Sequence, residues 1–598
     1  MTEIRAYLKE NTPLLFDGAM GTCFASLPGR AGERCELANL TRPEEIAAIH
    51  RAYLDAGCRA VKTNTFTVGA DIAQGQDGLA RAIVEAACRL ASDCAAPRGA
   101  YVFADIGPAP EEKGLCRAEN YCRQADLFLA QGIRCFLAET LPHDEGIAEL
   151  AQHIKSRCPD AFLIVSFAVS FDGMTRDGYP GETLFRRTAA LDGVDAVGFN
   201  CVSGPHHLLE YIRRLDTDGA TLSVMPNAGY PTVLGRRTVF QGTPDYFGRK
   251  LAQIAQAGAS IVGGCCGTTP AHIAQAARAL AAPQPFFSLP AQPVHSAESR
   301  PVPHANPLAE KLDSGQRVIA VELDPPADDD IAFFTDGIRT LRDAGADVIT
   351  IADNPIGRPR ADSSLLACKI KRELGVEPLP HLACRDRNLN ATKALLLGLS
   401  IEHIHNVLLV TGDPVPTENR DEVKSVFNFN SRKLTRYVSG LNETVLRTPF
   451  RIFTALNLNV ENFDVQLALA REKEAGGAAG FLTQPVLSRQ ALENLKRARE
   501  VLHGHILGGI LPIVSHKNAC FLRNEIAGIR ICDEIVGLYA GKDRAEAEEL
   551  AVRISARIAR EIAPFTDGLY LMTPFKRTAL MVRILNQLSL QTKNAQTR

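Results

Sequence analysis

Three cysteines lie where their thiols could bind one metal ion. Cys201 follows the apolar run AVGFN, and Cys265 and Cys266 follow the run ASIV within the stretch GGCCGTTP. Neighbouring side chains of a strand point to opposite faces, so the adjacent pair can meet one ligand only if the strand ends before it, as the flanking glycines indicate. Three thiolates and one open position are typical of catalytic zinc, which lowers the pKa of a bound thiol. We therefore expect a zinc ion that turns an incoming thiol into a nucleophile; inert buried cysteines are the alternative.

A second set of polar residues ends the apolar runs of the other half of the chain. The set comprises Glu322, Thr350, His381, Thr411, Gly412, Asp413 and Gln484. In a parallel barrel the carboxyl ends of the strands gather at one rim, so an acid, an amide and a second acid would face one site. The sequence leaves structural alternatives open: a salt bridge for Glu322, a helix N-cap for Asp413 and a loop hydrogen bond for Gln484.

Both sets need strands that end at one rim, and the sequence contains two series of such strands. In each series, short apolar runs alternate with amphipathic stretches whose apolar residues recur every three or four positions. The first series is LLFDGAMG, AVKTNTF, YVFADIGP, CFLAETL, FLIVSFAVS, AVGFNC, LSVMPNAG and SIVGGCCG. The second is VIAVELDPP, DVITIADNP, PLPHLAC, NVLLVTGDP, FRIFTALNLN, GFLTQPV, HILGGILPIV and GLYLMTPF. This alternation predicts an α/β fold with two (β/α)8 TIM barrels.

A proline-rich stretch without helical or strand periodicity separates the two series, and we interpret it as a linker. We predict a first barrel over residues 1–282, a linker over 283–309 and a second barrel over 310–598. The two halves share no residue-by-residue repeat. We therefore expect separate chemistries on one type of scaffold.

The charge balance favours small-molecule substrates. Lys and Arg number 66 against 68 Asp and Glu, the formal net charge is −2, and no long block of like charge occurs. We therefore expect neither nucleic-acid nor membrane partners. The N-terminus has charges where a signal peptide needs an apolar core, and no apolar run approaches the ~20 residues that span a bilayer. These features predict a cytoplasmic protein, with a homo-oligomer left open.

The first half resembles the homocysteine S-methyltransferase family over residues 14 to 280. The motifs that carry the resemblance are FDGAMGT, TNTF, AET, GFNC, PNAG and GGCCGTTP. The resemblance implies that Asp17 and Glu139 bind the ammonium group of homocysteine, since carboxylates are the expected partners of an ammonium. It also implies that Gly18, Thr63 and Asn64 belong to the amino-acid pocket.

Some features of this half stay open at the level of sequence. Asp17 could instead be a turn residue, because it lies in a DG pair. Asn200 and Asn227, at two strand ends, could face the pocket or hold a loop. The methyl donor is also open among methyltetrahydrofolate and sulfonium or betaine-type compounds.

The second half resembles the methylenetetrahydrofolate reductase family from about residue 318 to residue 588. The matching motifs are VELDPP, PHLAC, LLVTGDP, FLTQPV, GGILPI and TPFKRT. The resemblance implies bound FAD, NAD(P)H as reductant and reduction of 5,10-methylenetetrahydrofolate to 5-methyltetrahydrofolate.

The same resemblance assigns roles to residues. Glu322 would be the general acid that helps open the folate ring, Asp413 would lie near the flavin and the pterin, and Gln484 would bind the pterin edge. The implied cofactor-binding residues are Thr350, His381, Thr411, Gly412, Asp413, Ser431 and Arg471. The implied folate-binding residues are Glu322, Gln484 and His516.

The second half departs from its family at two positions. His516 lies near the place of a common aromatic residue, and Glu472 follows Arg471 where a lysine is usual. An acid near a phosphate would repel it, so this departure bears on the nucleotide contacts.

Together the halves predict a bifunctional enzyme of methionine and one-carbon metabolism. Its expected partners are homocysteine, a methyl donor and tetrahydrofolate derivatives. In the alternative, the N-terminal methyltransferase alone is active and the C-terminal barrel is a flavin- or folate-binding regulatory module.

Overall fold

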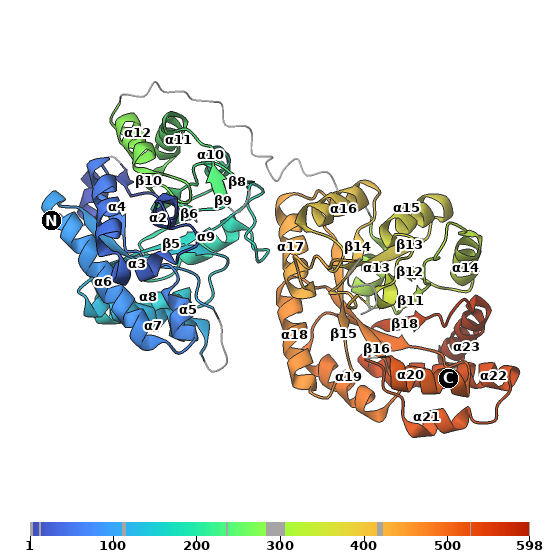
Figure 1. Cartoon of the computed structure of the whole chain (residues 1–598). Coiled ribbons are helices and arrows are strands. Elements are labelled where there is room, and N and C mark those ends of the chain that lie inside the picture. Colours follow the sequence, from blue (N-terminus) through green and yellow to red (C-terminus); the bar gives the residue numbers. More distant parts are fainter. Residues whose placement is uncertain are drawn as a thin grey trace. The chain divides into compact units, whose positions relative to one another are not determined.

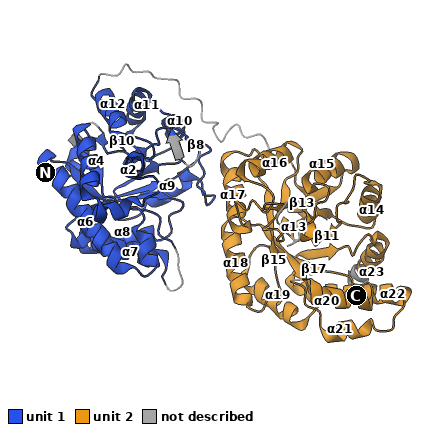
Figure 2. Ribbon diagram, viewed as in Figure 1, with its two compact units in different colours: residues 1–296 blue, residues 297–598 orange. Residues whose placement is uncertain are grey.

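The structure is a computed structural model that describes residues 4–10, 13–110, 115–234, 237–282, 305–415, 423–526 and 528–596. The chain divides into two compact units, residues 1–296 and residues 297–598 (Figure 2). Most of the predicted linker, residues 283–304, lies outside the described residues. Its last three residues, 307–309, belong to helix α13, which spans Pro307–Asp313.

The first unit is built on an eight-stranded parallel sheet in the order β1-β10-β7-β6-β5-β4-β3-β2. The two edges of this sheet meet beyond the end of β1, where Phe16 forms a parallel bridge with Ala60. The amide of Asp17 continues this contact with a 2.9 Å hydrogen bond to the carbonyl of Ala60. The sheet therefore curls into a nearly closed barrel, as predicted.

The bounds of the first unit's elements follow the predicted runs. The strands are β1 (Leu14–Leu15), β2 (Ala60–Lys62), β3 (Tyr101–Ile106), β4 (Cys135–Leu141), β5 (Phe162–Phe167), β6 (Ala196–Asn200), β7 (Leu222–Met225) and β10 (Ala259–Val262). The helices are α1 (Ile4–Glu10), α2 (Met20–Ser26), α3 (Ala38–Thr41), α4 (Pro43–Asp55), α5 (Val68–Ala73), α6 (Asp77–Ala95), α7 (Arg117–Ala130), α8 (Ile147–Arg157), α9 (Gly181–Ala189), α10 (Pro205–Ile212), α11 (Pro244–Gln256) and α12 (Pro270–Ala281). An antiparallel hairpin, β8 (Pro231–Leu234) and β9 (Arg237–Phe240), was not predicted.

The interior of the first barrel is apolar at the end where its strands begin. Leu14, Phe16, Phe103 and Ile164 form part of one buried cluster there, and Ile4 of α1 packs into it. Helix α1 therefore covers the amino-terminal mouth of the barrel. The polar residues are left to the opposite, carboxyl-terminal mouth, where barrel sites are built.

The second unit is a closed eight-stranded parallel barrel, in chain order from β11 to β18 (Figure 1). Its strands are β11 (Val318–Glu322), β12 (Val348–Ile351), β13 (Glu377–Ala383), β14 (Asn406–Val410), β15 (Arg451–Leu456), β16 (Gly480–Pro485), β17 (His505–Ile510) and β18 (Gly568–Met572). Its helices are α13, α14 (Ala332–Asp343), α15 (Ser363–Leu374), α16 (Leu389–Ile401), α17 (Ser431–Thr444), α18 (Phe463–Ala475), α19 (Arg489–Val501), α20 (His516–Glu525), α21 (Asp533–Leu538), α22 (Arg544–Ile562) and α23 (Thr578–Gln596). The predicted fold class, an α/β chain with two TIM barrels, is confirmed.

Helix α13 covers the amino-terminal mouth of the second barrel, as helix α1 covers that of the first. Leu308 and Leu312 join the buried interior cluster with Val318 and Phe453. The amino-terminal mouth is thus covered by apolar side chains, and the polar strand ends lie at the other mouth. Among the described residues, no helix is both long and apolar enough to cross a bilayer.

Candidate functional sites

The three predicted cysteines converge at the carboxyl-terminal mouth of the first barrel. The sulfurs of Cys201, Cys265 and Cys266 all lie within 4.8 Å of one another, and the Cys201 and Cys266 sulfurs are 3.7 Å apart. Strand β10 ends at Val262, so the adjacent pair lies in the turn that follows it. The turn frees both side chains from strand alternation. The three thiols can therefore face one point.

Unusual backbone geometry turns the third thiol toward this pair. Cys201 directly follows β6 and has a φ of 59°, and Val202 after it has a φ of 57°. Such left-handed conformations are costly for residues other than glycine, so the surrounding structure must hold them in place. Backbone hydrogen bonds do so: the Cys201 amide donates to the Met225 carbonyl, and the Ser203 amide donates to the Cys201 carbonyl.

The donor set fits a zinc ion. Tetrahedral bonds of about 2.3 Å from zinc to sulfur would place the sulfurs about 3.8 Å apart, close to the observed Cys201–Cys266 distance. The hydrogen bond with Cys265 lowers the pKa of Cys201, but the contact with Cys266 and burial outweigh it and raise this pKa to about 12. The hydrogen bond with Cys201 likewise lowers the pKa of Cys266, while the contact with Cys265 and burial raise it to about 12. Such thiols hold their protons at neutral pH unless a cation replaces them. A soft divalent metal would supply that cation.

Next to the thiols lies a buried group of three carboxylates around one lysine. Asp17 lies two residues beyond β1, Asp105 is the next-to-last residue of β3, and Glu139 lies two residues before the end of β4. All three are at most 6% exposed. The Nζ of Lys62 lies 3.9 Å from Asp17 Oδ1 and 3.8 Å from Glu139 Oε1. The two acids expected to bind a substrate ammonium thus already face one ammonium, that of Lys62.

The charges in this pocket perturb each other. Burial raises the pKa of Asp17 to about 7, against the lowering effect of Lys62. Burial, followed by the neighbouring Glu139, raises the pKa of Asp105. Burial alone would lower the pKa of Lys62, but Glu139 and Asp17 outweigh it and raise this pKa above its usual value. The lysine is therefore charged, and the pocket has more acids than cations.

Asn200 links the acidic pocket to the thiols. Its Nδ2 donates to Glu139 Oε2 at 2.8 Å and lies 3.8 Å from the Cys265 sulfur, while its Oδ1 accepts from the Thr140 amide at 2.8 Å. The sequence left Asn200 open between a pocket role and a loop role. In the structure its side chain contacts both the pocket and the loop.

The remaining predicted pocket residues form its wall. Thr63 accepts from the Asp105 amide at 2.9 Å, and Asn64 donates to the Cys35 carbonyl at 2.7 Å. A Cβ on Gly18 would lie 2.5 Å from Thr268 Oγ1, so this position requires glycine. These residues hold the loops that surround Lys62 and its acids.

In the second barrel, Glu322 lies in a network that the sequence showed only in part. The hydroxyl of Tyr570, on β18, donates to Glu322 Oε2. His381 Nε2 lies 3.7 Å from the same oxygen and has no hydrogen-bond partner among the described residues. Thr350 is fully buried and pairs with Glu322 across β11 and β12.

Burial sets the protonation of this group. It raises the pKa of Glu322 to about 8, with Asp324 adding to the effect and the Tyr570 hydrogen bond opposing it. It also lowers the pKa of His381 to about 3, so the imidazole is neutral. Glu322 is therefore a protonated carboxylic acid at neutral pH, which is the state that a general acid needs.

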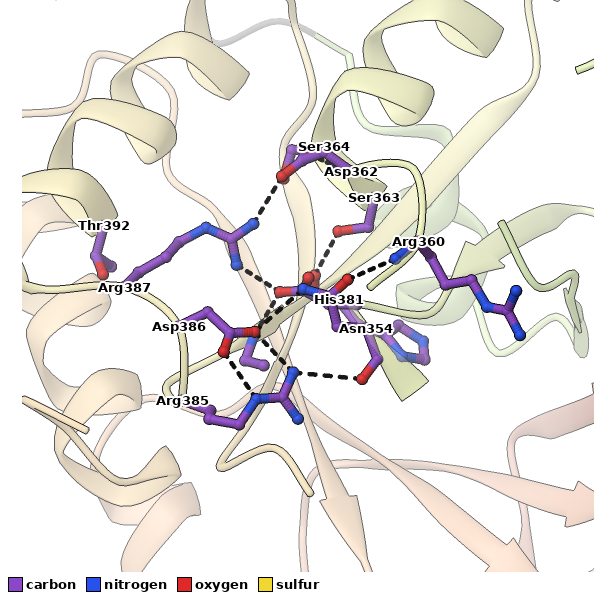
Figure 3. A network of polar contacts seen from close by, with 12 residues as sticks. Asn354, Arg360, Asp362, Ser363, Ser364, His381, Arg385, Asp386, Arg387 and Thr392 are labelled. Atoms are coloured by element: carbon purple, nitrogen blue, oxygen red, sulfur yellow. Dashed lines mark hydrogen bonds and ion pairs between the residues drawn. The ribbon is translucent and has the colours of Figure 1, made fainter. Parts of the chain in front are cut away.

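Asp413, in the loop after β14, is held by polar contacts from the two neighbouring loops after β12 and β13. Its Oδ2 accepts from the Ile356 amide at 2.8 Å, and its carbonyl accepts from Arg385 at 2.7 Å. Arg385 also reaches Asp386 and Asn354, as Figure 3 shows. In the same network Arg387 pairs with Asp353 and Asp362. These contacts join the loops after β12, β13 and β14.

The start of helix α17 carries another part of the predicted cofactor site. Ser431 Oγ lies 3.2 Å from Thr411 Oγ1 and its amide donates to the same oxygen at 3.3 Å. The intervening Gly412 has a φ of 90°, a conformation that favours glycine. Helix N-termini of this kind favour anions, so this corner is suited to a phosphate.

Arg471 does not join the other predicted cofactor residues. It is exposed on α18, in a recess lined by Val501 and His503, which precede β17 at the amino-terminal side of the barrel. Lys473, two residues later, is half-buried and donates to the Ala455 carbonyl near the end of β15. Burial, and then Arg432, lowers the pKa of Lys473 to about 8. The cation of α18 that reaches the site end is therefore Lys473.

Glu472 does not act as an isolated negative charge. Its carboxylate pairs with Arg432 at 2.6 Å and with Arg436 at 3.5 Å, both on α17. The repulsion that the sequence suggested is therefore offset locally.

Gln484 and His516 lie at the same mouth as Glu322. Gln484 is half-buried near the end of β16, and His516 is exposed at the start of α20, with its ring 3.8 Å from the Cys520 sulfur. Gln484 lies at the carboxyl-terminal end of β16 and His516 follows β17, so the structure brings both to the predicted rim.

Lys62, Asp105, Tyr570, Lys473 and Arg385 were missed by sequence reasoning. A signal was present for Lys62, because a lysine inside a buried strand run needs a partner. Tyr570 lies within an apolar strand run and gave no such signal.

Comparisons with known proteins match each barrel separately. The family model for homocysteine S-methyltransferase matches residues 14–280, and the model for methylenetetrahydrofolate reductase matches residues 308–589. Methionine synthases of Mycobacterium tuberculosis and Mycobacterium leprae are 33% and 32% identical over 292 and 299 residues. These matches cover 44% of this chain but 24% of each relative, so the chain spans about a quarter of their length.

Solved structures of the homocysteine methyltransferase MmuM from Escherichia coli also match. The metallated form is 25% identical, with 46% of this chain and 99% of that chain covered and a TM-score of 0.38. The apo form is 26% identical with a TM-score of 0.36. From the two family matches, the chain carries a homocysteine S-methyltransferase domain over residues 14–280 and a methylenetetrahydrofolate reductase domain over residues 308–589.

Proposed function

We propose that the chain catalyses two reactions of one-carbon metabolism. The first barrel transfers a methyl group to the sulfur of homocysteine, giving methionine, and uses zinc. The second barrel reduces 5,10-methylenetetrahydrofolate to 5-methyltetrahydrofolate with FAD and NAD(P)H. The family matches support both assignments.

The convergence of Cys201, Cys265 and Cys266 carries the first assignment. A zinc ion held there would supply Lewis acidity that keeps a substrate thiol deprotonated at neutral pH. Asp17 and Glu139 bind the ammonium of homocysteine. The substrate sulfur then attacks the methyl carbon of the donor, and the bond from that carbon to the leaving atom breaks with its electron pair.

The protonated carboxyl of Glu322 supports the second assignment. It delivers a proton to the folate nitrogen that leaves as the five-membered ring opens. The resulting iminium accepts a hydride, and FAD bound in the barrel would supply that hydride after reduction by NAD(P)H. Tyr570 orients the carboxyl, while Gln484 binds the pterin edge.

Asp413 and the start of α17 hold the remaining parts of the ligands. The carboxylate of Asp413 lies near the flavin and the pterin when these are bound, and the hydrogen bond from the Ile356 amide supports this role by fixing the carboxylate. A phosphate group of the cofactor binds at the start of α17, beside Thr411, Gly412 and Ser431. Lys473 is the nearby cation. The pairing of Glu472 with Arg432 removes one objection to nucleotide binding in this barrel.

One set of assays on the purified chain tests both reactions. Methionine formation is measured with homocysteine and a panel of S-methylmethionine, betaine and 5-methyltetrahydrofolate, with zinc content determined in the same sample. Flavin absorbance and reduction of 5,10-methylenetetrahydrofolate are measured in parallel. Flavin binding without folate turnover would favour the regulatory alternative for the second barrel, and no methyl transfer from any donor would contradict the first assignment.

A further inference from the structure

Lys62 occupies the position that the proposed function gives to the substrate ammonium. Its Nζ lies between Asp17 and Glu139, at 3.9 Å and 3.8 Å from their nearest oxygens. These distances are ion-pair separations and are longer than hydrogen bonds. A lysine placed this way neutralises the acids without satisfying their hydrogen-bonding capacity.

The strand register brings a third acid within reach of this lysine. Lys62 on β2 pairs with Phe103 on β3, and Asp105 lies two residues further along β3. Residues two apart on a strand share a face, so Asp105 points into the same interior as Phe103. Glu139 is related to Asp105 by the same step, because Asp105 pairs with Leu137 on β4. The side chains of Lys62, Asp105 and Glu139 therefore lie in one diagonal row on the inner wall of the barrel.

Two oxygens in the pocket have no hydrogen-bond partner among the described residues. They are Asp17 Oδ1 and Asp105 Oδ1, on side chains that are 1% and 6% exposed. Buried carboxylate oxygens are costly to leave without donors. Asp17 Oδ1 is thus available to an incoming ammonium, and Asp105 Oδ1 is available to the Lys62 ammonium.

We propose that Lys62 is a resident counter-ion of the amino-acid pocket. It neutralises Asp17 and Glu139 when the pocket is empty, and it moves to Asp105 when the ammonium group of the substrate takes its place. This inference rests on the proposed function of the first barrel, and it makes Lys62 a positioning residue that sets amino-acid affinity.

The charges explain why such a residue is needed. Without Lys62, the described residues would leave three buried acids in one pocket without a neighbouring cation, and each one that ionised would be strongly unfavourable. With Lys62, the empty pocket is more stable, but the substrate ammonium has to compete for the same two acids. Lys62 therefore lowers amino-acid affinity, and Asp105 limits that loss by receiving the displaced lysine.

Calorimetric titration of the zinc-loaded full chain with homocysteine tests this exchange. Lys62→Met, which keeps the side-chain length without the charge, is expected to bind homocysteine about tenfold more tightly, within the range of ordinary coupling between sites. Asp105→Asn is expected to bind it several-fold more weakly, because the displaced lysine loses its acceptor. In the double variant the effect of Asp105→Asn should disappear, since no lysine remains to be received.

A second ligand separates ammonium competition from general loosening of the pocket. 4-Sulfanylbutanoate keeps the thiol and the carboxylate but lacks the amino group, so its affinity should not change in Lys62→Met. Unchanged or weaker homocysteine binding by Lys62→Met would overturn the inference, as would an Asp105→Asn effect that persists in the double variant. If Lys62→Met does not fold, unchanged binding by Asp105→Asn alone would overturn it. Failure of the unaltered chain to bind homocysteine would instead contradict the proposed function.

Discussion

Arg385 donates a 2.7 Å hydrogen bond from Nη1 to the main-chain carbonyl of Asp413, and this contact ties the end of β13 to the loop after β14. The arginine is 2% exposed, and its other nitrogens reach Asp386 and the carbonyl of Asn354. The planar guanidinium of Arg385 thus connects three loops by hydrogen bonds. The position of the Asp413 carboxylate depends on this support.

Replacing Arg385 by Met should therefore weaken the second site. We expect flavin content and folate reduction to fall at least about tenfold, as for other supporting residues around a binding site. Arg385→Lys should not restore them, because an ammonium cannot bond to three partners in the plane of a guanidinium. Arg339→Met, which removes an exposed pair with Asp336 on α14, is the matched control. Full flavin content in Arg385→Met would show that Asp413 holds its position without this contact.

The pH dependence of folate reduction should report Glu322. Its pKa is raised to about 8, so the acid is protonated below that pH and loses its proton as the pH rises through it. Folate reduction should accordingly decline on the alkaline side near pH 8. Glu322→Gln should lower the rate by about 10²–10⁴ while leaving flavin absorbance unchanged. Reductase activity equal to that of the unaltered chain would mean that another group delivers the proton.

Tyr570→Phe removes the hydroxyl that donates to Glu322. This hydrogen bond favours the ionised carboxylate, so its loss should raise the pKa of Glu322 further. The alkaline limb of the pH profile should then move to higher pH, with a lower maximal rate because the carboxyl is less well oriented. The pH profiles of folate reduction are recorded for the unaltered chain and for Tyr570→Phe. An alkaline limb at the same pH in both would show that Tyr570 does not influence the pKa of Glu322.

Zinc removal should separate the two activities. A chelator, or Cys201→Ser, is expected to lower methyl transfer more than about 100-fold, since even outer residues of zinc sites contribute 10–100-fold. Folate reduction should be unaffected, because the thiols and Glu322 lie in different barrels. Metal analysis and both assays on one sample check this, and a parallel loss of both activities would contradict it.

Asn200→Ala should weaken zinc binding without removing a ligand. The amide of Asn200 orients Glu139 and contacts the Cys265 sulfur, so its loss should lower zinc affinity by about 10–100-fold. Asn227→Ala is the comparison at the same rim, because Asn227 Oδ1 has no hydrogen-bond partner among the described residues. Competition with a chromogenic chelator measures both. Equal losses in the two variants would argue against a specific role for Asn200.

Much of the fold could be predicted because its signals are local. The alternation of apolar runs and amphipathic stretches depends on neighbouring residues, and the predicted runs coincide with β1 to β7 and β10 and with β11 to β18. The β8–β9 hairpin was missed because it is an insertion between two barrel strands. The strand-end glycines likewise indicated that Cys265 and Cys266 lie beyond a strand.

Orientation around helix α18 separates two cations that sequence position alone does not distinguish. Arg471 and Lys473 are two residues apart on α18, which places them on different sides of the helix. The sequence offered both cations, whereas helix packing placed Lys473 toward Ala455 and left Arg471 exposed. Motif position alone could not distinguish them.

The sequence by itself determined the two barrels, the rim at which each site lies and the three cysteines that converge at the rim of the first barrel. It could do so because strands and their ends are recognised from the types of neighbouring residues. The tertiary structure alone decided that Lys62 lies between Asp17 and Glu139 and that Tyr570 donates to Glu322. These contacts join residues 45, 77 and 248 positions apart, as the residue numbers give. The stagger between strands decides which side chains share a level inside a barrel, and that stagger is a property of the closed sheet.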